Sequence, residues 1–138
     1  MITGHTFNSN NLFVAHNSKE GESTLKVESP TAGKEQLMVY VKFDRKSESA
    51  VAKLKMEMSD PKINNGTPFQ MCRLDGSTVM PVEIVVVRSG FYRVPVPAGS
   101  NETKIFVNAE VVDGLAGQDT LEFWVALNAY QPVSGMIQ

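Results

Sequence analysis

Two alternating stretches near the end of the chain constrain its fold more than any other feature. Apolar residues occupy every second position in 104–112, and the same period returns in 120–127. A period of two is typical of β-strands with one buried face. An antiparallel hairpin that sets Val111 beside Leu121 would bring both sets of apolar side chains onto one face, and a shift of one residue would separate them. We therefore predict a hairpin here, closed by the turn-rich loop 113–119.

Shorter strand signals fill most of the remaining chain. They lie at 24–29, 36–43, 50–58, 69–74, 82–87 and 91–96, with clusters of turn-forming residues between them. Many short strands without an intervening helix pattern indicate an all-β fold, because half-apolar strands bury their faces in sandwiches or barrels. We predict a single antiparallel β-sandwich of about eight or nine strands, jelly-roll or immunoglobulin-like, with extended terminal arms.

Some of these strands need a further argument. Residues 50–58 are rich in helix formers, yet a helical stripe would leave Met56 in water, whereas a strand turns the apolar side chains inward. The strand is therefore favoured. Residues 82–87 are apolar on both faces, as expected of a central strand, and Ser89-Gly90 predicts a tight return into the next strand. Pro95 lacks the N–H that a two-residue hairpin would need there, so pairing is expected to stop short of it unless the register differs.

The length of 138 residues indicates one domain. Residues 1–23 are polar apart from an apolar patch at 12–15, and they are predicted to be an N-terminal arm or an edge strand. Residues 24–128 are assigned to the sandwich and 129–138 to a C-terminal tail. The first residues show neither the charged start nor the apolar run of a signal peptide, so synthesis in the cytosol is expected.

Charge and composition argue against two kinds of partner. The formal net charge is -2, which gives no field to attract nucleic acid or an anionic membrane. No apolar stretch approaches the roughly 20 residues that span a bilayer. The single cysteine, Cys72, cannot form an internal disulfide and is expected to be a buried thiol.

Residues that carry chemistry are scattered. His5 and His16 lie in the polar leader without metal-ligand spacing and are expected to be ordinary surface histidines. Asp113 and Asp119 could supply oxygens to calcium, but a solvated loop is the better interpretation, and the same holds for Asp60 beside two asparagines. No nucleophile elbow, phosphate-binding loop or metal-binding motif is present, so the sequence predicts no catalytic site, no metal and no cofactor.

The outward face of the predicted hairpin is the unusual feature. Phe106 and Trp124 share it with polar residues. Large rings on a polar face are generally covered by something. Three explanations remain open: an arm of the same chain, a protein partner that uses the rings as anchors, or a carbohydrate that stacks on them. Phe106, Trp124, Phe13 and Leu12 are the candidate interface residues.

From Ala50 onward, AVAKLKMEMSDP is followed by FQMCRLDGSTVMP, GFYRVPVPAGSNETKIFVNAEV and GQDTLEFWVAL. This order of strands and turns, over about the last two-thirds of the chain, resembles small β-sandwich structural proteins of tailed bacteriophages, including capsid decoration (cement) proteins. The chain has Phe69 where a tryptophan is common in that pattern, and Pro61 follows the Ser-x-Asp turn.

The resemblance implies a non-enzymatic virion structural protein that assembles in the host cytoplasm. Such a protein would bind the major capsid protein or another virion protein of the assembled shell, bridge neighbouring subunits, and form a homo-oligomer, with a trimer favoured. It would contact neither nucleic acid nor membrane. The alternative is a carbohydrate- or receptor-binding β-sandwich module of a phage appendage, which would use the outward rings of Phe106 and Trp124.

Overall fold

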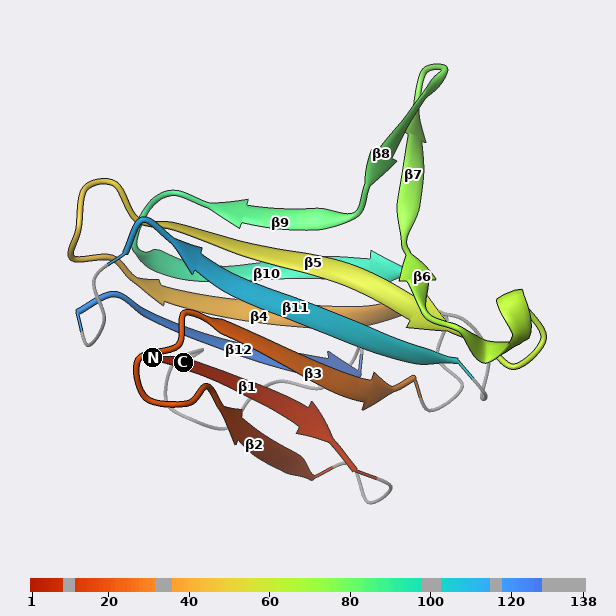
Figure 1. The fold of residues 1–138 in the computed structure, drawn as a ribbon, viewed down its shortest axis with the longest axis horizontal. Helices are drawn as coiled ribbons and strands as arrows, with labels where there is room; N and C mark the ends of the chain where they lie inside the picture. Colours follow the sequence, from red (N-terminus) through yellow and green to blue (C-terminus); the bar gives the residue numbers. More distant parts are fainter. Residues whose placement is uncertain (9–11, 32–35, 98–102, 115–117, 128–138) are drawn as a thin grey trace.

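The computed structural model describes residues 1–8, 12–31, 36–97, 103–114 and 118–127. The predicted all-β sandwich is confirmed, with two main sheets packed together (Figure 1). The described residues form twelve strands rather than eight or nine, because residues 1–23 contribute two, the predicted strand 69–74 is divided into two, and 78–81 forms a strand that the sequence does not predict. Within these residues, no helix is long and apolar enough to cross a bilayer.

Sheet A contains the strands at both ends of the described chain. Its order is β10 (Gly90–Pro97), β4 (Gln36–Asp44), β12 (Thr120–Leu127), β1 (Ile2–Phe7) and β2 (Phe13–Asn17). Sheet B has the order β3 (Thr24–Pro30), β11 (Lys104–Val112) and β5 (Val51–Ser59), with β6 (Phe69–Gln70) and β9 (Glu83–Val86) both paired to the far edge of β5. A separate hairpin joins β7 (Cys72–Asp75) to β8 (Thr78–Pro81), and a single 3-10 turn spans Asn64–Gly66.

The inward side chains of both sheets form one apolar core. Its large members include Ile2, Phe7, Leu37, Phe43, Leu54, Met56, Ile105, Leu121 and Phe123. Burial of each such side chain contributes about 1.5–3 kcal/mol, so this layer supplies most of the folding free energy.

The predicted hairpin of 104–112 and 120–127 is wrong. Both stretches are strands with the expected alternation, but β11 pairs with β3 and β5 whereas β12 pairs with β4 and β1. The chain therefore crosses from sheet B to sheet A between them. Because the inward side chains of the two strands face the same core, a hairpin and a crossover satisfy the alternation equally well.

Residues 1–23 contribute two strands of sheet A. β1 lies inside the sheet, with Ile2 and Phe7 in the core, and β2 forms the edge. The β1–β12 pair is parallel, in contrast to the antiparallel sandwich that the sequence predicts. The close packing of β1 beside Phe123 of β12 depends on Gly4, because a Cβ at this position would lie 2.5 Å from Cζ of Phe123. The predicted tail 129–138 lies outside the described residues.

The predicted hairpin that joins 82–87 to 91–96 is also wrong. Instead of a tight return at Ser89-Gly90, β9 pairs with β5 in sheet B and β10 pairs with β4 in sheet A. β9 is also not a central strand: it lies at a sheet margin, and Val85 is exposed. Pairing runs through Pro95, which is tolerated because an edge strand has N–H groups without a ladder partner.

The strand predicted over 50–58 is confirmed as β5. Ala52, Leu54 and Met56 are buried, as the strand interpretation requires, and Lys53 and Lys55 lie on the outer face. β5 is an interior strand of sheet B, between β11 and the pair β6 and β9.

Candidate interaction surface

The hairpin of β7 and β8 stands away from the body of the sandwich (Figure 1). We call residues 72–81 the β7–β8 arm. Backbone hydrogen bonds fix its base: Met71 N–H donates to Met56 O (3.1 Å), Met56 N–H to Val82 O (3.2 Å), and Val82 N–H to Met71 O (2.7 Å). The arm therefore starts from a fixed point on β5.

The arm is a regular amphipathic ribbon. Gly76 has φ 63° at the first position of its two-residue loop, which is the glycine position of a type II′ turn. Strand alternation places the side chains of four residues on one face: Cys72, Leu74, Val79 and Pro81. Arg73, Asp75, Thr78 and Met80 form the other face.

No part of the arm is buried. All eight strand residues are exposed, and the opposed pair Leu74 and Val79 are 74% and 63% exposed. A two-stranded ribbon is only marginally stable by itself, and an uncovered apolar face is characteristic of an interaction site. The arm is the clearest candidate for such a site among the described residues.

The sequence predicts this region only in part. A strand over 69–74 and a turn at 75–77 are present, but the strand is divided at Met71, whose side chain enters the core. The expected burial of Cys72 is wrong, because the chain leaves the sandwich directly after Met71. Alternation identifies an apolar face and contains no information on whether another layer covers it.

The two outward rings lie on opposite surfaces of the sandwich. Phe106, on the outer face of sheet B, is half-buried, and Lys26 Nζ lies 5.4 Å from its ring centroid. Trp124, on the outer face of sheet A, is only 5% exposed. His5 stacks on its indole at 4.8 Å with an interplanar angle of 6°, and Phe91 lies at 5.9 Å. Residues of the same chain therefore cover Trp124, and it does not lie beside Phe106.

The other two candidate interface residues lie at the margin of sheet A. Leu12, the residue before β2, is 60% exposed, and Val14 in β2 is also exposed. Phe13 is half-buried, and its ring meets His5 edge-on at 6.4 Å. The exposed apolar residues of this margin, Leu12 and Val14, are less exposed than Leu74 and Val79 of the β7–β8 arm.

Neither histidine is an ordinary surface residue. His5 Nε2 lies 2.8 Å from Glu122 Oε2, so the imidazole is held both by this contact and by its stacking. His16 is half-buried, with Nε2 3.0 Å from Thr6 Oγ1. His16 lies in β2, whereas Cys72 lies at the base of the projecting arm (Figure 1).

Two of the three carboxylates considered for calcium have structural partners, whereas Asp113 is exposed. Asp119 is buried, not solvated: its Oδ1 accepts the N–H groups of Lys46 (2.6 Å) and Ser47 (2.9 Å), and its Oδ2 accepts the Ser47 hydroxyl (2.7 Å). Asp60 is likewise buried and accepts the Lys62 N–H at 2.8 Å. Among the described residues, no three His, Cys, Asp or Glu side chains are placed to hold a metal ion.

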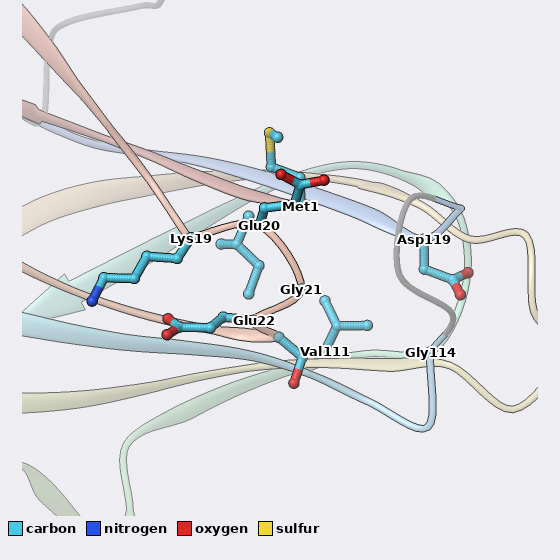
Figure 2. Close-up of a pocket in the computed structure, with 10 residues that line it drawn as sticks. Met1, Lys19, Glu20, Gly21, Glu22, Val111, Gly114 and Asp119 are labelled. Atoms are coloured by element: carbon cyan, nitrogen blue, oxygen red, sulfur yellow. The ribbon is translucent and has the colours of Figure 1, made fainter.

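A cavity of about 660 Å³ opens at one end of the sandwich, beside the start of β1 and the end of β11 (Figure 2). Lys19 and Asp119 lie at its opposite sides. Lys19, Glu20 and Glu22 are exposed residues of the β2–β3 connection, and the Asp119 oxygens accept the hydrogen bonds described above. The described lining therefore supplies charges without a positioned acid–base pair.

The chain was compared with protein families, curated proteins and solved structures. No family model, curated protein or solved structure matches it.

Proposed function

We propose that the protein is a non-enzymatic structural protein that assembles through the β7–β8 arm, of the capsid decoration kind that its strand order resembles. The observation that carries this proposal is the exposed apolar face of the arm on a fixed base. A ribbon that projects from a closed sandwich on a hydrogen-bonded base is suited to reaching a neighbour while the body stays folded. In this role the body would bind a virion protein such as the major capsid protein, and the arm would bridge neighbouring positions.

Burial of the apolar face of the arm against a partner would favour association. Full burial of Leu74 and Val79 would contribute about 1.5–3 kcal/mol each. A single contact of this size is weak, because association opposes it with lost translational and rotational freedom. On a lattice the same contact repeats, and the repeated attachments raise the effective affinity.

The alternative of a carbohydrate-binding module has less support from the geometry. That interpretation rests on an exposed aromatic ledge, but His5 already stacks on Trp124 and leaves the ring 5% exposed. Phe106 is half-buried on the opposite surface.

The test begins with the genes on both sides of the coding sequence, where we expect head-assembly genes. Shells assembled from the major capsid protein of that cluster are then mixed with the purified chain and sedimented. We expect saturable binding at a fixed ratio to shell subunits, and binding weaker by about ten-fold or more for Leu74→Asp. Val85→Asp, an exposed valine on β9, is the matched control and should bind normally. Absence of shell binding, or equal binding by both variants, would contradict the proposal.

A further inference from the structure

The outer edge of β7 has no partner strand. Within the described residues, β7 pairs only with β8. Natural sheets protect exposed edges with proline, with lysine or other charged side chains, with bulges or by keeping the strand short. β7 is short and carries Arg73 and Asp75, but these charges have opposite signs and can pair with a strand that presents them in reverse order. β8 ends in Pro81, whereas β7 reads Cys-Arg-Leu-Asp and contains neither proline nor lysine. A partner strand can therefore add to β7 through main-chain hydrogen bonds.

The charges on β7 favour one partner. Arg73 and Asp75 flank Leu74 on the opposite face of the ribbon. In the described part of the chain, neither takes part in an ion pair or a side-chain hydrogen bond. If a second β7 pairs antiparallel about Leu74, each Arg73 lies opposite the Asp75 of the other copy, and the two leucines lie opposite each other.

Other registers of the same pairing are unfavourable. A register centred on Arg73 or on Asp75 opposes like charges, and so does an in-register parallel arrangement. A register shifted by one residue sets Arg73 opposite Leu74 and mixes the polar and apolar faces. The self-complementary register is therefore the one centred on Leu74.

Building on the proposed function, we propose that the β7 edge binds β7 of a second copy of this chain, in an antiparallel pair centred on Leu74. The product is a four-stranded ribbon with two-fold symmetry, in the order β8, β7, β7, β8. Leu74 and Val79 of both copies form one continuous apolar row, so each Leu74 gains an apolar neighbour on its second side. The contact is isologous and closes at two copies, in contrast to the trimer that the resemblance implies.

Exchanging the charges of Arg73 and Asp75 tests the proposed register of the β7–β7 pair. Arg73→Asp alone, or Asp75→Arg alone, replaces two attractive pairs with two repulsive ones, and the dimer dissociation constant should rise by about ten-fold or more. The double variant Arg73→Asp/Asp75→Arg restores both pairs and should restore the dimer. Arg93→Asp, an exposed arginine on β10, is the control. Sedimentation equilibrium should give twice the 15.1 kDa chain mass for the wild type, the double variant and the control. A mass of one or three chains for the wild type, or a double variant that stays monomeric, overturns the inference.

Cross-linking tests the geometry even if the dimer is weak. In a Cys72→Ser background, Leu74→Cys places two thiols directly opposite each other, with Cβ atoms about 4.5–5.5 Å apart, and should give a disulfide-linked dimer under mild oxidation. Val79→Cys, on the same apolar face, lies three strands from its counterpart, at about 14 Å, and should not. Equal cross-linking of the two variants overturns the inference.

The outcome also separates this inference from the proposed function. If the arm is needed for binding to shells but neither dimer test succeeds, the arm binds a different protein: the proposed function stands and the self-pairing is wrong. If the dimer forms and shells are not bound, the proposed function fails while the pairing stands.

Discussion

Asp119 ties together two loops that both cross between the sheets. Lys46 and Ser47 lie between β4 of sheet A and β5 of sheet B, and Asp119 lies just before β12, where the chain has returned to sheet A. One buried carboxylate accepts two backbone N–H groups and a hydroxyl from the neighbouring crossover. Hydrogen bonds to a charged group are among the stronger ones in proteins, so this contact helps to fix how the sheets meet.

Replacing this carboxylate should therefore be costly. Asp119→Ala leaves the N–H groups of Lys46 and Ser47 without their acceptor, and we expect the free energy of unfolding to fall by about 2–4 kcal/mol. Urea denaturation followed by circular dichroism measures it. Asp113→Asn is the control on the same loop, because Asp113 is exposed and Asn tolerates its φ of 56°. Equal losses for the two variants would show that the hydrogen bonds of Asp119 contribute little.

The fluorescence of Trp124, the single tryptophan, shows whether other side chains cover its indole. His5 stacks on Trp124, so His5→Ala should expose the indole, shift its fluorescence to longer wavelength and lower stability by about 0.5–1.5 kcal/mol. His16→Ala is the matched control, since His16 contacts Thr6, whereas His5 and Phe91 are the rings beside Trp124. An unchanged emission spectrum for His5→Ala would mean that other side chains keep the ring covered.

At the scale of elements, Gly4 allows β1 to enter sheet A. A Cβ at Gly4 would collide with the Phe123 ring, so Gly4→Ala should destabilise the protein by about 1–3 kcal/mol through overpacking. Phe123→Leu removes the end of the ring and also costs stability by itself. In the double variant the collision is relieved, and the combined loss should be smaller than the sum of the two single losses. Additive losses in thermal unfolding would indicate that the collision is relieved in some other way.

The alternation in the sequence identifies which residues face the core but not which strands are neighbours. The inward positions of β11, β12 and β5 are as predicted, because burial of one face follows directly from a period of two. Two predicted hairpins are wrong because a short loop can either reverse a strand or carry it to the opposite sheet. The parallel pairing of β1 with β12 joins residues more than one hundred positions apart, and nothing local in either segment specifies it.

On the scale of the whole molecule, the interaction surface depends on what the sandwich leaves uncovered. The sequence predicts a strand over 69–74 followed by a turn, with Cys72 as a buried thiol. Instead, backbone hydrogen bonds between Met71, Val82 and Met56 hold the base of residues 72–81 on the sandwich, and the residues beyond that base stay exposed. Burial of an apolar face is a property of the complete set of layers, so local sequence could not reveal that this face is bare.

This arrangement predicts that stability and association are separable. The arm can be replaced by Asn-Gly between Met71 and Val82, because the Val82 N–H already donates to Met71 O, as across a two-residue turn. The exposed strand residues contribute little to the core, so the free energy of unfolding should change by less than about 1 kcal/mol. Sedimentation equilibrium should then show a monomer. A loss of several kcal/mol would instead make the arm part of the folding unit, while retained self-association at full stability would move the contact to another surface, such as the margin at Leu12 and Phe13.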